Sequence, residues 1–293
     1  MSEAFFWRMK SFKALKIVLV LAAAFFLGGC FLLNKFVYTD KELAEHYQNK
    51  AVKPVYKDLQ FLGRRLHYAV MERSDTLPLL IFIHGAPGAW YGYLNLMDDS
   101  LLQTRFKMVS LDRLGYGKSN YGKAELSVQM QALEVKRIIE EENSTGRKVL
   151  LVGRSYGAPI AAWYAIHYPQ NVEKLLMISP VIDPDKEKFY WFSKIGRWAL
   201  VQAMLPDLLN VATEEKYSHS AEMRKMLPQW GKLYSTTYVI TGASDDLADT
   251  ANFSFAKRHL VNCRGTFIKL KNTGHQVTRQ HPEVIKEILL KRE

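Results

Sequence analysis

Residues 153–157 read Gly-Arg-Ser-Tyr-Gly and directly follow an apolar run at residues 149–152, with Ser155 at the centre. A tight turn from a strand into a helix crowds neighbouring Cβ atoms, so it needs glycine on both sides. Such a turn would expose the Ser155 hydroxyl at a sheet edge, where it can act as a nucleophile. A serine that merely caps a helix would not explain both glycines. The pattern therefore predicts Ser155 as a nucleophile.

Two backbone amides are candidates for binding the negative charge that attack by a serine develops on a carbonyl oxygen. The Tyr156 amide belongs to the start of the helix expected after Ser155, where N–H groups are free to bind an anion. The second candidate is Ala86, in the His-Gly-Ala-Pro-Gly segment that follows an apolar run at residues 79–83. Pro87 has no N–H to donate, so Ala86 and Tyr156 are the predicted oxyanion donors.

Residues 112–119, Asp-Arg-Leu-Gly-Tyr-Gly-Lys-Ser, resemble the Asp-x-x-Gly-x-Gly-x-Ser loop that follows a strand in cap-bearing α/β-hydrolases. Together with the two preceding motifs, this loop makes residues 55–293 similar to the α/β-hydrolase fold family. The resemblance implies a serine hydrolase, because the dehalogenase and epoxide-hydrolase branches of the family carry aspartate where Ser155 stands. The loop at residues 112–119 is interpreted as scaffold.

The family orders its triad as serine, acid and histidine, which implies an acid after the strand expected at residues 238–241. Asp245 stands three residues past the turn glycine there, and Asp246 is the runner-up. Asp249 is interpreted as the cap of the next helix, at residues 250–260. Asp183, after the preceding strand, is an alternative that some relatives use.

The same order implies a histidine base after the last strand, and His275 follows the run at residues 266–270 in an Asn-Thr-Gly-His segment. In the implied mechanism His275 takes the Ser155 proton and Asp245 fixes the tautomer of the imidazole. His84 comes too early in the chain for this role and is interpreted as structural.

Apolar runs of strand length alternate with helical patterns, which predicts an α/β fold with a doubly wound, mostly parallel sheet behind an antiparallel entry hairpin. Ser127 opens one helix that runs to about residue 142, and His281-Pro282 opens the last one. The expected strands span residues 55–62, 65–71, 79–83, 108–111, 149–152, 175–178, 238–241 and 266–270.

About fifty-five residues separate the strands expected at residues 175–178 and 238–241, roughly twice what a simple crossover needs. This interval is rich in aromatic residues and helix formers, which predicts an inserted helical cap at about residues 183–236. The aromatic side chains favour a cap that lines a pocket over a long crossover with an extra helix.

Residues 17–33 are all apolar, Gly or Cys, and four basic residues lie just before them. A helix of this length comes near the lower limit for crossing a bilayer, and the preceding charges favour a cytoplasmic N-terminus. Residues 1–33 are therefore predicted to be a signal anchor, or a lipoprotein signal peptide in which Cys30 is lipidated. Either alternative places the later residues outside the cytoplasm, with residues 34–54 as a linker to the domain at 55–293.

The formal net charge is +11, but the basic residues are spread out and do not alternate with aromatic residues in a stripe, so no nucleic-acid partner is predicted. The chain holds two cysteines, Cys30 and Cys263, which exclude a disulfide framework. No residues have the spacing of metal ligands, and neither a metal nor another cofactor is predicted.

Hydrolysis of a small-molecule carboxylic ester is the leading functional hypothesis. The segment at residues 84–88 also resembles the oxyanion loop of proline iminopeptidases, so an aminopeptidase acting on an amide is an alternative. An aminopeptidase would need carboxylates for the substrate ammonium, and Glu187, Glu214, Glu215 and Glu222 of the cap are the candidates, although carboxylates on such helices are usually solvated. Two further hypotheses are acyl transfer to an alcohol and a catalytically silent binding protein.

Overall fold

The computed structural model describes residues 37–189, 194 and 196–291, and the predicted anchor at residues 1–33 lies outside these. In the part that is described, no helix is both long and apolar enough to span a membrane. The chain divides into two compact units, residues 1–53 and 54–293. Helix α2 (Asp40–Tyr47) belongs to the first unit and begins with a capping box, in which Thr39 and Glu42 bind each other's backbone amides.

The second unit is built on an eight-stranded sheet with the order β1-β2-β4-β3-β5-β6-β7-β8. Strands β1 and β2 form the expected antiparallel entry hairpin, β2 also pairs antiparallel with β4, and all later pairs are parallel. The predicted α/β class and mostly parallel sheet are therefore confirmed. The strands are β1 (Val55–Phe61), β2 (Arg64–Met71), β3 (Leu79–Ile83), β4 (Lys107–Leu111), β5 (Val149–Arg154), β6 (Val172–Ile178), β7 (Thr236–Gly242) and β8 (Gly265–Leu270).

Strands β3 and β4 are buried along their whole length, because helices cover both faces of the parallel part of the sheet. All five residues of β3, which read Leu-Leu-Ile-Phe-Ile, are buried. The parallel register pairs Ile83 with Leu111 of β4 and with Gly153 of β5. The carboxyl ends of these three strands therefore meet at one edge of the sheet, and the loops that follow them lie close together.

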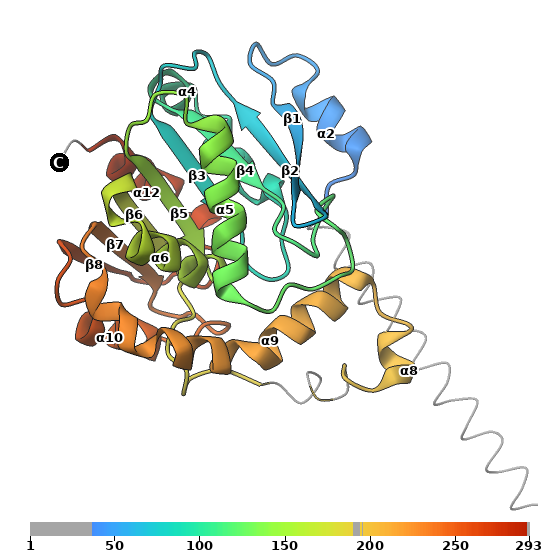
Figure 1. Cartoon of the computed structure of the whole chain (residues 1–293), viewed down its shortest axis with the longest axis vertical. Coiled ribbons are helices and arrows are strands. Elements are labelled where there is room, and N and C mark those ends of the chain that lie inside the picture. Colours follow the sequence, from blue (N-terminus) through green and yellow to red (C-terminus); the bar gives the residue numbers. More distant parts are fainter. Residues whose placement is uncertain (1–36, 190–193, 195, 292–293) are drawn as a thin grey trace, which may run out of the picture. The chain divides into compact units, whose positions relative to one another are not determined.

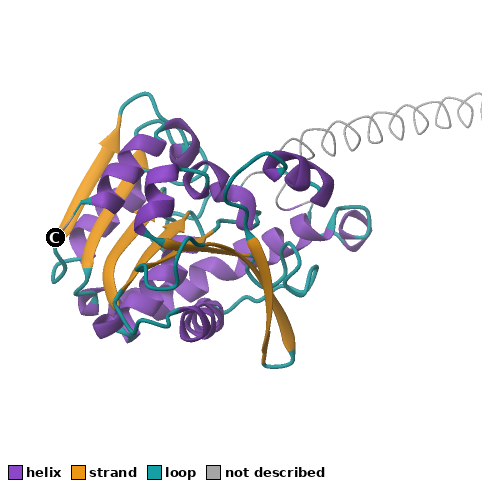
Figure 2. Ribbon diagram, turned by 90° about the horizontal axis from the view of Figure 1, so that it is seen from above, coloured by secondary structure: helices purple, strands orange, loops and turns teal. Residues whose placement is uncertain are grey.

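Helices α5 and α6 pack against each other on one face of the sheet, and α12 packs against α3 and α4 (Figure 1). The view from above shows the twisted strands lying between helices (Figure 2). The helices of the main layer are α3 (Leu94–Met97), α4 (Ser100–Arg105), α5 (Val128–Glu142), α6 (Gly157–His167), α10 (Ala251–His259), α11 (Val277–Gln280) and α12 (Pro282–Leu290), with 3-10 turns η1 (Trp90–Tyr93) and η2 (Pro169–Asn171).

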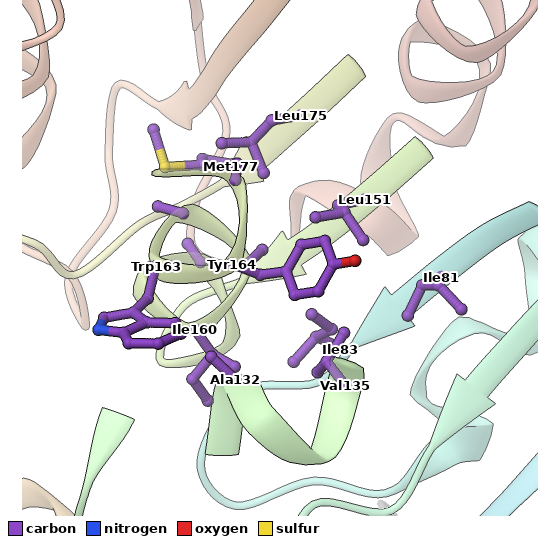
Figure 3. Packing of buried hydrophobic residues seen from close by; sticks show 14 of the residues in the cluster. Ile81, Ile83, Ala132, Val135, Leu151, Ile160, Trp163, Tyr164, Leu175 and Met177 are labelled. Atoms are coloured by element: carbon purple, nitrogen blue, oxygen red, sulfur yellow. The ribbon is translucent and has the colours of Figure 1, made fainter. Parts of the chain in front are cut away.

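The hydrophobic core lies between the sheet and helices α5 and α6, as Figure 3 shows. Helix α6 is buried at every position from Gly157 to Ile166, which fits its apolar sequence on all sides. Ser127 caps α5 by accepting a hydrogen bond from the Met130 amide at 3.3 Å, as expected from the sequence.

Between β6 and β7 the chain forms α8 (Ala199–Gln202), α9 (Asp207–Met226) and the 3-10 turn η3 (Leu227–Lys232), so the expected insertion is helical. In Figure 1 the long helix α9 runs below the start of α5. The described aromatic residues of this insertion have different environments. Trp230 is fully buried in the main core, whereas Phe189 and Trp198 are 44% and 64% exposed. The aromatic residues of the insertion thus differ widely in exposure, and their pocket-lining role stays a prediction.

Candidate active site

Ser155 lies in a sharp turn between β5 and α6 and has a φ of 53°, a left-handed conformation that is strained for a residue with a side chain. Its amide donates a hydrogen bond to the Ile178 carbonyl at 2.9 Å. A side chain at Gly153 would clash with the Gly157 carbonyl, and one at Gly157 would clash with the Ile83 carbonyl. Both glycines are thus required by close backbone packing, as the sequence suggested.

The loop after β3 lies directly against this turn. A Cβ atom on Gly85 would come within 2.9 Å of the Ser155 Cβ and 3.5 Å of its Oγ, so glycine is what allows the approach. Ala86 follows Gly85, and Tyr156 follows Ser155. The two predicted oxyanion donors therefore belong to two segments that are in contact with each other.

His84 holds the shape of this loop. Its Nε2 accepts a hydrogen bond from the Arg113 amide at 3.0 Å, so the ring proton is on Nδ1, which donates to the Gly85 carbonyl at 2.6 Å. Complete burial, and then the nearby Arg113 charge, lower the pKa of His84 well below its usual range. A neutral histidine with both nitrogens occupied fits the structural role expected for His84.

Asp245 and His275 are in direct contact at the carboxyl ends of β7 and β8. The His275 Nδ1 lies 2.9 Å and 3.1 Å from the two carboxylate oxygens of Asp245. The amides of Leu247 and Ala248 donate to Asp245 Oδ1 at 3.0 Å and 2.8 Å. Burial alone would raise the pKa of Asp245, but the hydrogen bond and charge of His275 and the two amides together lower it. Asp245 is therefore an ionised partner that orients the imidazole.

The other aspartates considered for this role bind elsewhere or face solvent. Asp246 is exposed. Asp249 accepts a hydrogen bond from the Ala251 amide at 2.9 Å and lies one residue before Thr250, the N-cap residue of α10. Asp183 accepts from the Asp185 amide at 3.0 Å. Among the described residues, Asp245 is the carboxylate that binds His275.

The turn at Ser155 is joined to the histidine loop through adjacent residues. Arg154 Nη1 donates to Gln276 Oε1 at 3.2 Å, and the Ser179 hydroxyl donates to the His275 carbonyl at 3.3 Å. The imidazole itself is hydrogen bonded to Asp245 rather than to Ser155. The structure thus brings Ser155, Asp245 and His275 to one edge of the sheet, where they follow β5, β7 and β8 in turn.

Arg113 is a central residue of the site that the sequence did not single out. Its buried guanidinium donates to the His84 carbonyl at 3.0 Å and to the Gly85 carbonyl at 3.1 Å, and it also binds Gln131. The centre of the guanidinium lies 4.9 Å from the centroid of the Tyr156 ring. Arg113 therefore contacts both segments that carry the predicted oxyanion donors.

Glu215 of α9 supplies the counter-charge for Arg113, with N–O distances of 2.6 Å and 3.0 Å. The Tyr116 hydroxyl donates to the same carboxylate at 2.7 Å. Burial alone would lower the pKa of Arg113, but the charge and hydrogen bonds of Glu215 outweigh it and raise the pKa. A buried, doubly bonded ion pair thus fixes α9 to the loops of the site.

The loop at residues 112–119 is held by Asp112. Its carboxylate accepts hydrogen bonds from the Trp90 and Lys118 amides, each at 2.8 Å. Gly117 has a φ of 52°, and a side chain there would clash with the Asp112 carboxylate. These contacts fit the scaffold role inferred for the loop. Because they hold Asp112 at the end of β4, the following residue, Arg113, is held there as well.

Of the four glutamates considered as ammonium ligands, three are less exposed to solvent than expected. Solvation fits Glu214, which is exposed, but Glu215 and Glu222 are buried and Glu187 is mostly so. Each of the latter three already binds a cation, as Glu215 binds Arg113, Glu222 binds Lys225, and Glu187 binds Lys216. The expected solvation of cap carboxylates is wrong for these three, because partners from the fold and from α9 offset their burial.

No cluster of three or more histidine, cysteine or acidic side chains in the described part of the chain is arranged to hold a metal ion. Cys263 is a free thiol whose pKa is raised by burial. Cys30 lies outside the described residues.

Comparisons with known proteins find similarity to one fold family. Residues 78–210 match the family described as alpha/beta hydrolase fold. The chain is 28% identical to Epoxide hydrolase 4 of Mus musculus over 159 residues, which are 49% of this chain and 43% of that protein. It is 23% identical to a proline iminopeptidase of Lactobacillus acidophilus over 189 residues, which are 58% of this chain and 63% of that protein. The matched segments thus span less than two thirds of these relatives.

Solved structures agree over most of the chain. A membrane phospholipase A, described as a bacterial virulence factor, has a TM-score of 0.64 at 22% identity and covers 95% of this chain and 97% of its own. A 2-hydroxy-6-oxo-6-phenylhexa-2,4-dienoate hydrolase from Rhodococcus also has a TM-score of 0.64, at 16% identity, and covers 82% and 98%. The chain is thus similar to the α/β-hydrolase fold family in sequence and has the fold of its members. At the turn after β5, this chain carries Ser155.

Proposed function

We propose that this protein is a serine hydrolase that cleaves carboxylic esters through an acyl-enzyme on Ser155. The observation that carries the proposal is the strained turn at Ser155, which is packed against the loop after β3 and stands on the same sheet edge as the Asp245–His275 pair. A serine hydroxyl needs such a base, oriented by a carboxylate, to become a nucleophile at neutral pH.

In the proposed reaction His275 accepts the Ser155 proton while Oγ attacks the ester carbonyl. The amides of Ala86 and Tyr156 bind the oxyanion of the tetrahedral intermediate. His275 then protonates the departing alcohol, and the acyl group remains on Ser155. Water, deprotonated by His275, attacks the acyl carbon and releases the acid, which restores the serine. Asp245 stabilises the imidazolium in both steps.

A fluorophosphonate probe tests the nucleophile directly, because it reacts covalently with an activated serine. We expect labelling of the wild-type chain and none of Ser155→Ala. A folded wild-type protein that resists the probe and turns over no ester would contradict the proposal.

The acid is tested by a matched pair of neighbouring substitutions. Asp245→Asn should lower kcat by about 10³- to 10⁴-fold, because the amide stabilises the wrong tautomer of His275. Asp246→Asn removes an exposed carboxylate and should leave kcat within about twofold of wild type. The reverse order of the two effects would show that Asp246 is the acid.

An aminopeptidase is the nearest alternative, since proline iminopeptidases are among the relatives. The cation partners of Glu187, Glu215 and Glu222 disfavour it, because these carboxylates are already neutralised. A screen of 4-nitrophenyl esters of increasing acyl length beside aminoacyl naphthylamides separates the two activities. Faster turnover of the naphthylamides than of every ester would favour the aminopeptidase.

We also propose that residues 1–33 tether the catalytic domain to a membrane, on the side away from the cytoplasm. The support is the uncharged run at residues 17–33 and the four basic residues before it. The full chain should sediment with membranes, and a chain beginning at residue 34 should not. Mass spectrometry of the mature N-terminus separates an intact Met1 from a lipidated Cys30, and a soluble full-length chain would refute both.

A further inference from the structure

Helix α9 directs one more polar side chain at the turn of the proposed nucleophile. Three buried charged or polar residues, Glu215, His219 and Glu222, share one face of this helix. Glu215 binds Arg113, and Glu222 accepts a hydrogen bond from the Val128 amide at 3.0 Å. His219, between them on this face, is only 1% exposed.

The His219 ring packs against Tyr156, the residue that follows Ser155, with ring centroids 5.0 Å apart. Its Nδ1 lies 2.8 Å from Oε2 of Glu187, near the start of the insertion. Neither ring nitrogen makes a hydrogen bond of ordinary geometry among the described residues, so Nδ1 has only this contact with Glu187 and Nε2 is buried without a partner. Buried polar atoms in folded proteins are nearly always paired, so the unpaired Nε2 of a ring that packs on Tyr156, the neighbour of Ser155, points to a ligand.

The neighbours of His219 indicate which kind of ligand group fits Nε2. A proton on Nδ1, the nitrogen that faces the Glu187 carboxylate, leaves the lone pair of the ring on Nε2. Lys216 Nζ lies 2.7 Å from the other oxygen of Glu187 and supplies a counter-charge for this carboxylate. Nε2 is then a hydrogen-bond acceptor, which complements a hydroxyl or N–H group and repels a carboxylate.

We propose that His219 is a specificity-determining residue, whose Nε2 accepts a hydrogen bond from a hydroxyl or N–H group of the ester substrate. This inference rests on the proposed ester hydrolysis at Ser155. It narrows the substrate class to esters that carry a hydrogen-bond donor near the scissile carbonyl. The donor belongs either to the acyl group or to the alcohol, and both sources offer the same chemistry to Nε2.

Isosteric substrate pairs test the proposal, because each pair differs only by a methyl group in place of a hydroxyl. 4-Nitrophenyl 3-hydroxypropanoate against 4-nitrophenyl butyrate examines the acyl side, and 2-hydroxyethyl butyrate against propyl butyrate examines the alcohol side. In one pair, the wild-type kcat/KM for the hydroxyl ester should exceed that for its isostere by about tenfold. Which pair shows the preference identifies the source of the donor.

His219→Phe keeps a ring against Tyr156 but removes Nε2, so it should reduce that preference to about one. His219→Gln, whose amide oxygen is an acceptor, should retain part of the preference. Glu214→Gln, an exposed change on the same helix, is the matched control and should leave the preference unchanged.

Fluorophosphonate labelling and turnover of the methyl isosteres report on the proposed function separately from the role of His219. If labelling and turnover persist but the wild type shows no preference in either pair, the role of His219 is refuted while the ester hydrolase stands. A preference that survives in folded His219→Phe refutes it equally. Loss of labelling in the wild type refutes the underlying hydrolase instead.

Discussion

Strand β4 has a buried cation near each of its ends, and the two differ in what they bind. Lys107, the first residue of β4, lies 3.0 Å from Glu142 and from Glu72 and 2.8 Å from Asp75. Arg113, two residues past the other end, binds the carbonyls of the loop after β3 and the Glu215 carboxylate of α9. The side chains of Arg113 and Lys107 are 1% and 5% exposed, but only Arg113 contacts the candidate active site.

The partners of Lys107 all lie away from the candidate active site, in residues that connect strands and helices of the domain. Glu142, at the end of α5, also binds Lys57 of β1 and accepts a hydrogen bond from the Tyr68 hydroxyl of β2 at 2.7 Å. This cluster joins three strands to one helix, and it contains none of the predicted catalytic residues. Burial of a charge therefore does not by itself indicate function; what matters is which groups its partners position.

Replacing Arg113 should produce the largest combined effect. Arg113→Met leaves Glu215 buried without its counter-charge, which should lower the free energy of unfolding by about 3–5 kcal/mol. It also releases the Gly85 carbonyl and the Tyr156 ring, so kcat of the folded variant should fall by about 100-fold. Urea unfolding and ester turnover below the unfolding transition measure the two effects.

The double variant Arg113→Met with Glu215→Leu separates stability from positioning. Apolar side chains in place of both charges should restore most of the free energy of unfolding. The kcat should stay low, because the hydrogen bonds to the loop after β3 are still missing. A stable double variant with wild-type kcat would show that Arg113 serves only to neutralise Glu215.

At the other end of β4, Lys107→Met should affect stability alone. Burial by itself would lower the pKa of Lys107, but its bonds to Asp75, Glu142 and Glu72 raise it, so the charge is well stabilised in the folded chain. Its loss should lower the free energy of unfolding by about 3 kcal/mol. The kcat of the folded variant should stay within about twofold of wild type. A fall in kcat comparable to that of Arg113→Met would overturn the contrast between the two ends.

Acid should weaken the Lys107 cluster through Glu142. Burial alone would raise the pKa of Glu142, but hydrogen bonds from Tyr68, Lys107 and Lys57 outweigh it and place the pKa below the ordinary value of 4.5. A carboxyl with a depressed pKa stabilises the fold above that ordinary value and loses the contribution as pH falls through the folded pKa. Unfolding of wild type and Glu142→Gln between pH 7 and 3 should show a difference that shrinks below about pH 4.5. A difference in the free energy of unfolding that stays constant over this range would contradict a lowered pKa of Glu142 in the folded chain.

The sequence predicted the scaffold of the site because its signals are local. The five apolar residues at 79–83 form β3 over the same range, and glycines at positions 153 and 157 are required by backbone contacts within one turn. His275 and Asp245 could be proposed because each follows a strand in an expected order, and the structure places them in contact. Patterns of this kind need no knowledge of distant partners.

The role of Arg113 and Glu215 could not be predicted in the same way, since 102 residues separate them. A glutamate on a polar helix is expected to be solvated, and only a buried cation from another loop reverses that expectation. One signal was present in the sequence. Val211, Glu215, His219 and Glu222 recur at helical spacing, so a single face of α9 combines an apolar residue with charged and polar ones.

An exposed ion pair shows how little a charge contributes to the free energy of unfolding when it is not buried, and the two buried cations can be compared with it. Arg137 and Glu141 lie one turn apart on α5 at 3.1 Å, and their side chains are 36% and 45% exposed. Water already solvates both charges, so Glu141→Gln should change the free energy of unfolding by no more than about 0.5 kcal/mol. That small difference should fall further in 1 M salt, which screens exposed charges, whereas the cost of Lys107→Met should persist. If Glu141→Gln lowers the free energy of unfolding in urea as much as Lys107→Met does, then burial does not explain the stability that the charged residues near β4 contribute.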